Sequence, residues 1–142
     1  MINISFYNKY KKYKNKYLQE KMNQSGGIIK ISIQNPQNTP WLDWIETGVK
    51  KYEGRLNKGI FAKLHVGDIV IWYDRISGKE VKTEITELRY YVTFTDAFNK
   101  LGKNLVPIPN ITPELVEKLY AQYFTKEDIE KYGVLTIGVK PL

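Results

Sequence analysis

The chain has 142 residues, of which 42% are hydrophobic, and a net charge of +7 at neutral pH. This length supports one compact core but not two independent ones, so we expect a single folded domain. The absence of cysteine excludes disulfides, thiolate metal sites and a thiol nucleophile. No apolar run approaches the roughly 20 residues that cross a bilayer, and the N-terminus is rich in Lys and Tyr. We therefore expect an intracellular protein without a membrane partner.

The positive charge is concentrated in residues 1–27, which hold six lysines and a single acidic residue, Glu20. Their aromatic residues recur at helical spacing, as Phe6, Tyr10, Tyr13 and Tyr17, which favours a short basic helix or tail. Residues 24–27 then read as a flexible linker. Three roles stay open for this segment: packing on the domain or a partner, direct RNA contact through the lysines, or a sorting or packaging tag.

Residues 28–142 read as the folded domain, and their charge is nearly balanced, with sixteen basic and fourteen acidic side chains. The β-branched run of residues 28–33 predicts a first strand. A helix of about two turns is expected over residues 40–48, with Thr39 as a possible N-cap and Gly48 as its C-terminal stop. Residues 69–73 are wholly apolar, as in a strand that lines a barrel.

A turn at Ser77–Gly78 leads to a returning strand whose apolar phase slips after Ile85. The slip predicts a β-bulge near Thr86–Glu87, which would bend the strand around a small barrel. Short helices are expected over residues 95–101, 112–123 and 125–131, and a last strand over residues 134–139. These elements predict an α+β fold: a small mixed β-barrel with peripheral helices.

The segment around residues 50–55 contains the candidate site. If the strand begins near Lys51, alternation puts Lys51, Glu53 and Arg55 on one face, and Lys50, Tyr52 and Gly54 on the other. Glu53 and Arg55 can then pair. Such a pair can fix a guanidinium plane for phosphate or base contact, or it can be a purely structural ion pair.

Lys50 could act as a nucleophile or general base only if burial or a neighbouring cation lowered its pKa. Contact with a phosphate, or plain solvation, are the alternatives. Trp41 and Tyr52 are candidates for stacking an unpaired base, whereas most of the other aromatic residues are expected in the core. His65 is the only histidine and lacks acidic neighbours at ligand spacing, so we expect neither a metal nor another cofactor.

The segment Gly48-Val49-Lys50-Lys51-Tyr52-Glu53-Gly54-Arg55-Leu56, followed by Gly67-Asp68 and an apolar strand, resembles the ASCH domain family. Tyr123-Phe124 and the acidic helix before the final strand are similar to the family's C-terminal pattern. The resemblance implies a PUA-like barrel with peripheral helices and a role in RNA binding. One bacterial branch of the family hydrolyses the acetyl amide of N4-acetylcytidine with a Lys, a Thr and a Glu. In an alignment with that branch, Lys50 falls at the position of the catalytic Lys, whereas Glu53 occupies the position of the Thr. This difference makes the chain look more like the non-bacterial branch of the family.

Two functions from different classes follow. The first is an RNA-binding module that recognises RNA or a modified nucleotide in a cleft formed by Trp41 and by Lys50, Lys51, Tyr52, Glu53 and Arg55. The alternative is an N4-acetylcytidine amidohydrolase in which Lys50 activates water and Glu53 relays the proton. We expect a monomer. The Lys/Tyr-rich segment ending in Gly-Gly also resembles segments of giant DNA virus proteins, which would imply the host cytoplasm or the virion.

Overall fold

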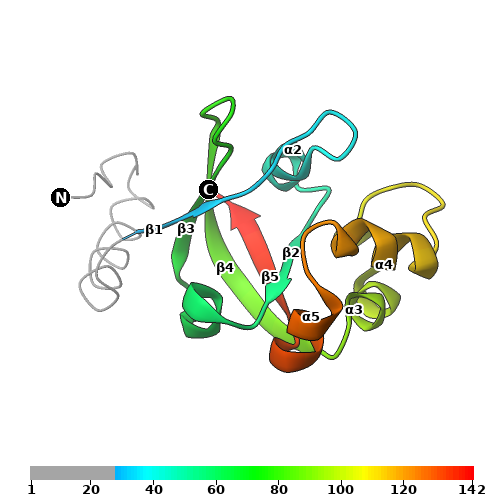
Figure 1. The fold of residues 1–142 in the computed structure, drawn as a ribbon. Helices are drawn as coiled ribbons and strands as arrows, with labels where there is room; N and C mark the ends of the chain where they lie inside the picture. Colours follow the sequence, from blue (N-terminus) through cyan, green and yellow to red (C-terminus); the bar gives the residue numbers. More distant parts are fainter. Residues whose placement is uncertain (1–27) are drawn as a thin grey trace.

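The computed structural model describes residues 28–142, so the expected basic helix and linker of residues 1–27 lie outside the described residues. Residues 28–142 contain five strands and four α-helices (Figure 1). The strands are β1 (Ile29–Ser32), β2 (Tyr52–Leu56), β3 (Ile69–Tyr73), β4 (Glu80–Tyr91) and β5 (Val134–Pro141). The α-helices are α2 (Trp41–Thr47), α3 (Phe94–Leu101), α4 (Pro113–Ala121) and α5 (Lys126–Tyr132), with short 3-10 helices at Gly59–Lys63 and Gly102–Asn104.

The strands form one sheet in the order β1-β3-β4-β5-β2, in which β1 and β3 are parallel and the other neighbours are antiparallel. The sheet curls into a half-barrel, so its two edge strands approach each other. Arg55 of β2 spans the remaining gap, because its Nη2 donates a hydrogen bond to the carbonyl oxygen of Ser32 on β1 at 2.9 Å. The expected α+β fold, a mixed barrel with peripheral helices, is therefore confirmed, with the barrel present as a curled five-stranded half-barrel.

The predicted bulge is present in β4. The pairing of β4 with β5 shifts between Ile85 and Glu87, which leaves Thr86 as the extra residue. Gly138 on β5 lies opposite the bulge, and a Cβ there would come within 2.8 Å of Thr86 Oγ1 and 3.2 Å of the Glu87 amide nitrogen. The bulge bends β4, as the phase slip in the sequence indicated.

Most helix ends follow the sequence, apart from the start of α2 and the end of α4, which stops at Ala121 rather than at Tyr123. Gly48 ends α2 in the left-handed conformation, with φ of 81°, and Thr112 and Thr125 cap α4 and α5 as predicted. The prediction of Thr39 as the cap of α2 is wrong. The side chain of Asn35 takes that role, because its Oδ1 accepts hydrogen bonds from the amides of Leu42 and Asp43 at 3.1 and 3.2 Å.

The core lies between the sheet and the helices α2, α3 and α4. Trp72 is fully buried in it, and its indole N–H donates to the hydroxyl of Thr83, which in turn donates to the carbonyl of Val70.

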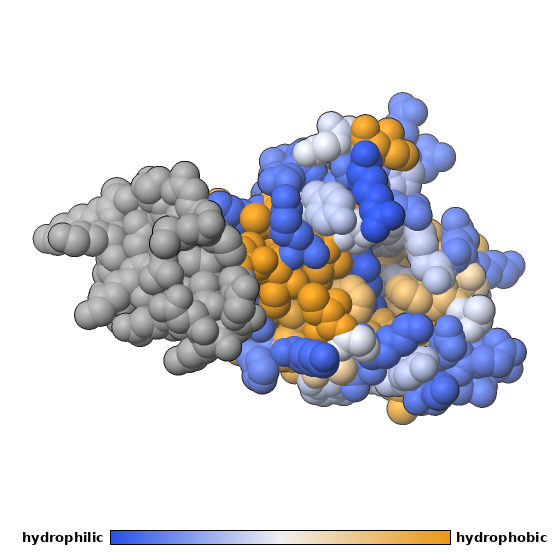
Figure 2. Space-filling model, turned by 60° about the vertical axis from the view of Figure 1, so that its left-hand side comes forward, coloured by the Kyte–Doolittle hydropathy of each residue, from blue (hydrophilic) through white to orange (hydrophobic). Residues whose placement is uncertain are grey.

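Apolar residues also gather on the surface beside the N-terminal end of the described chain (Figure 2), where β1 and β3 lie. None of the helices in residues 28–142 is long and apolar enough to cross a membrane.

Candidate functional site

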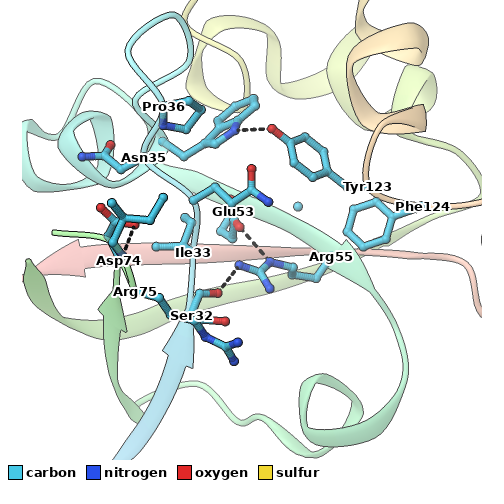
Figure 3. Close-up of a pocket in the computed structure, with 14 residues that line it drawn as sticks. Ser32, Ile33, Asn35, Pro36, Glu53, Arg55, Asp74, Arg75, Tyr123 and Phe124 are labelled. Carbon is cyan, nitrogen blue, oxygen red and sulfur yellow. Dashed lines mark hydrogen bonds and ion pairs between the residues drawn. The ribbon is translucent and has the colours of Figure 1, made fainter. Parts of the chain in front are cut away.

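A cleft of about 650 Å³ opens where the two edge strands of the half-barrel meet (Figure 3). Its walls come from five parts of the chain: the end of β1 with the following loop, the start of α2, β2, the β3–β4 hairpin, and the connection between α4 and α5. Its size falls within the range of small-ligand sites, roughly 300–1,000 Å³. The main polar lining residues are Asn35, Glu53, Arg55, Asp74 and Arg75, and the main aromatic ones are Trp41, Tyr123 and Phe124.

Glu53 lies in the cleft between two cations. Its Oε2 accepts a hydrogen bond from Arg55 Nε at 2.8 Å, and its Oε1 is 3.6 Å from Lys50 Nζ. The Glu53 side chain is only 8% exposed, so these ion pairs are poorly screened by solvent. The predicted Glu53–Arg55 pair is thus confirmed, and Lys50 joins it to form a triad of net charge +1.

Lys50 is buried behind Glu53 rather than solvated. Its ammonium has no exposed surface, donates a hydrogen bond to the carbonyl of Leu105, and lies 4.8 Å from the centroid of the Trp41 ring. Burial lowers the pKa of Lys50 to about 8, with a smaller contribution from the charge of Arg55, while Glu53 opposes the shift. A lysine with such a pKa is half deprotonated at about pH 8.

Arg55 presents its guanidinium at the floor of the cleft. It packs against two aromatic rings, with its Cζ 5.1 Å from the Phe61 centroid and 5.5 Å from that of Trp72. Its hydrogen bonds with other described residues, to Glu53 and to the Ser32 carbonyl, use two of its five N–H groups. The planar group is thereby fixed in position while donors remain for a ligand.

Aromatic residues form the wall opposite Asn35 and Asp74 (Figure 3). Tyr123 accepts a hydrogen bond from the indole N–H of Trp41 at 3.2 Å, which fixes both rings. Phe124 stacks on Phe94 with centroids 5.3 Å apart. Trp41 is only 5% exposed, whereas Tyr123 and Phe124 are half-buried, so the latter two offer the larger surface to a ligand.

The structure brings Trp41, Lys50, Glu53 and Arg55 together but places Lys51 and Tyr52 away from the cleft. Lys51 is exposed beside β2, and Tyr52 donates a hydrogen bond from its hydroxyl to Glu87 on β4 at 3.1 Å. The predicted alternation of faces is also wrong for Lys50. It precedes the strand, in the turn after α2 where its amide bonds to the Trp44 carbonyl, and its side chain therefore reaches the Glu53 side.

Sequence reasoning did not assign Asn35, Arg75, Tyr123 or Phe124 to the site. The Tyr123-Phe124 pair carried a signal, because it belongs to the family pattern, but nothing in the sequence placed it opposite β2. Among residues 28–142, no three His, Asp or Glu side chains are grouped as metal ligands. His65 is well exposed and lies outside the cleft, with its Nδ1 3.9 Å from Asp68 Oδ2.

Comparison with known proteins places this architecture in context. The family model described as ASCH domain matches residues 38–142. The crystal structure of the hypothetical protein PH0355 is 30% identical, with a TM-score of 0.68, and the match covers 80% of this chain and 100% of that one. The protein PF0455 from Pyrococcus furiosus is 27% identical, with a TM-score of 0.62 and coverage of 80% and 96%.

A more distant neighbour shares the fold alone. ASCH from Zymomonas mobilis is 14% identical over 79% of this chain and 68% of its own, with a TM-score of 0.53. No curated protein sequence matches the chain.

Proposed function

This chain belongs to the ASCH domain family, and on that premise we propose that it binds RNA and holds an unpaired nucleotide in the cleft between β1 and β2. ASCH domains are generally RNA-binding or hydrolase-like, so both classes have to be weighed against this site. The geometry favours binding, because the cleft offers the donors of Arg55 and the rings of Tyr123 and Phe124 to a base and its phosphate. The candidate catalytic base, Lys50, is instead buried behind Glu53.

The observation that carries the proposal is the fixed guanidinium of Arg55. It is 18% exposed at the cleft floor, is oriented by Glu53 and Ser32, and keeps N–H groups for a phosphate or for the acceptor edge of a base. The triad with Lys50 has a net charge of +1 in a poorly solvated place, which attracts an anionic or acceptor group.

The aromatic wall supports a nucleotide as the ligand. Single-stranded RNA is commonly recognised by stacking unpaired bases on aromatic rings and by hydrogen bonds to their edges. Tyr123 and Phe124 present such rings across the cleft from Asn35. The near-neutral charge of residues 28–142 agrees with recognition in a local cleft rather than on a broad basic face.

Replacing Arg55 with glutamine tests the proposal. We expect Arg55→Gln to weaken binding of a fluorescein-labelled single-stranded RNA pool of randomised sequence by roughly 10- to 30-fold, as for the loss of a charge-assisted hydrogen bond. Fluorescence anisotropy of the full chain measures the affinity. Arg89→Gln is the matched control, because Arg89 pairs with Glu87 on β4 and does not line the cleft. Equal affinities of the two variants would exclude the cleft as the RNA site.

The lysines of residues 1–27 require a separate variant. Replacing all six with glutamine should reduce the dependence of affinity on salt concentration while the effect of Arg55→Gln persists. If the variant with the six glutamines no longer binds and Arg55→Gln changes nothing, binding belongs to residues 1–27 and the proposal fails.

One observation favours a second function, hydrolysis of N4-acetylcytidine. The pKa of about 8 for Lys50 suits a general base, and Glu53 lies between Lys50 and the cleft, where it could pass a proton from an attacking water. Water would add to the acetyl carbonyl, and breakage of the amide bond would release acetate and cytidine. The buried Lys50 ammonium does not itself reach the cleft, so this function depends on relay through Glu53.

A mass-spectrometric assay of the full chain with N4-acetylcytidine tests this alternative. It predicts time-dependent release of cytidine that is abolished in both Lys50→Met and Glu53→Gln, and unchanged in Arg89→Gln. Absence of cytidine with the wild-type chain would reject the hydrolase function, and retained turnover in Lys50→Met would reject Lys50 as the base.

A further inference from the structure

The tip of the β3–β4 hairpin carries an apolar side chain that is not buried in the core. Ile76 is 97% exposed, yet it lines the cleft together with its neighbour Arg75. Isolated exposed apolar residues are common on protein surfaces and need no explanation by themselves. Here the residue lines the proposed nucleotide site, and hydrogen bonds to Asp74 hold the backbone of its turn.

Asp74 fixes the conformation of the turn. Its carboxylate accepts hydrogen bonds from the hydroxyl of Ser77 at 2.7 Å and from the amides of Ser77 and Ile76 at 3.2 and 3.3 Å. Its carbonyl accepts from the amide of Gly78 at 2.8 Å, and Gly78 adopts the positive φ of 77° that the turn requires. These bonds, the Ser77 hydroxyl first, lower the pKa of Asp74.

The base of the hairpin is fastened to α2. Lys79 Nζ forms ion pairs with Asp43 at 2.6 Å and Glu46 at 2.7 Å. The hairpin is therefore held against the helix whose first residue, Trp41, lines the cleft. A rigid turn presents Ile76 with little conformational entropy left to lose, and a β-branched side chain is itself stiff.

We propose that Ile76 inserts into the base stack of the bound RNA as an apolar wedge and thereby separates the nucleotide in the cleft from its neighbour. This inference rests on the proposed function. Proteins that unstack nucleic acid commonly insert one apolar side chain between bases and contact the phosphates with adjacent cations. Ile76 supplies the apolar side chain and Arg75 the adjacent cation, and Arg55 binds the nucleotide that is separated from the stack.

The residues around Ile76 favour RNA over a membrane or a protein as the binding partner of the hairpin tip. The turn residues around Ile76 are polar or charged, namely Asp74, Arg75, Ser77 and Lys79. A single apolar side chain in such surroundings is far smaller than the patches that dock proteins or insert into a lipid surface. It does match the gap that opens between two bases when they unstack.

The test uses the full chain and an RNA hairpin with one bulged nucleotide next to a 2-aminopurine, whose fluorescence rises on unstacking. Anisotropy of a terminal dye reports binding, and 2-aminopurine fluorescence at saturating protein reports unstacking independently of affinity. We expect Ile76→Ser to lose at least about half of the fluorescence rise and to bind roughly tenfold more weakly. Ile76→Leu should keep both signals. Because Ile76 is exposed, neither substitution should change the melting temperature.

The outcomes separate the wedge from the binding function. A full fluorescence rise in saturated Ile76→Ser would overturn the wedge while leaving RNA binding intact. Failure of the wild-type chain to bind this RNA and the randomised pool would refute the proposed function and the wedge with it. Binding of the wild-type chain to vesicles of phosphatidylcholine and phosphatidylserine that is lost in Ile76→Ser would assign the tip to membranes instead.

Discussion

Replacing Glu53 with glutamine is expected to lower the free energy of unfolding by about 3 kcal/mol at pH 7, because it leaves Lys50 buried without its anionic partner. The ammonium of Lys50 has no exposed surface, and its hydrogen bond goes to the carbonyl of Leu105. Breaking a buried ion pair typically costs about 3–5 kcal/mol. We place the cost at the lower end because Lys50, with a pKa of about 8, can lose its proton when Glu53 no longer supports the charge.

The double variant Lys50→Met with Glu53→Gln provides the matched control. Methionine has a volume similar to that of the lysine stem and can keep the contact with the Trp41 ring without a charge. Urea unfolding followed by circular dichroism should show the double variant to be more stable than Glu53→Gln alone. If Glu53→Gln is as stable as the wild type, Glu53 does not stabilise the buried ammonium.

The stability of the protein is expected to rise with pH between about 8 and 10, with Lys50 contributing about 2–3 kcal/mol over this range. Lys50 has a pKa of about 8 in the folded chain, against 10.5 in the unfolded chain. In this window the unfolded chain therefore binds more protons than the folded chain, so raising the pH favours folding. Well below pH 8 both states hold the proton, and the cost of burying the charge is constant.

Comparison with Lys50→Met isolates this contribution from the other groups that titrate in the window. Tyr120 acts in the opposite direction, because burial first and the charge of Glu53 second raise its pKa well above 10. The unfolded chain then loses the tyrosine proton first, and stability falls as the pH exceeds 10. Urea unfolding at half-unit steps of pH should give the wild type a steeper rise between pH 8 and 10 than Lys50→Met. Parallel curves would mean that Lys50 titrates alike in both states.

The sequence by itself determined most of the strands and α-helices of residues 28–142 and the family. Hydrophobic periodicity placed the strands because alternation exposes one face of a sheet, and threonine caps and glycine stops marked helix ends through local hydrogen bonding. The bulge near Thr86 was visible because a phase slip in a strand has few other causes. The Glu53–Arg55 pair was equally local, since residues two apart on a strand share a face.

Only the tertiary structure decided what surrounds that pair. Lys50 reaches Glu53 because the turn after α2 directs its side chain into the protein, and its burial depends on Trp41 and on Leu105, which is 55 residues away. Asn35 caps a helix that begins six residues later, and Tyr123 meets Trp41 across 82 positions. Ile76 lines the cleft because the curl of the sheet brings the β3–β4 hairpin towards β2. Such contacts depend on how strands and helices pack in space, and no spacing along the chain records them.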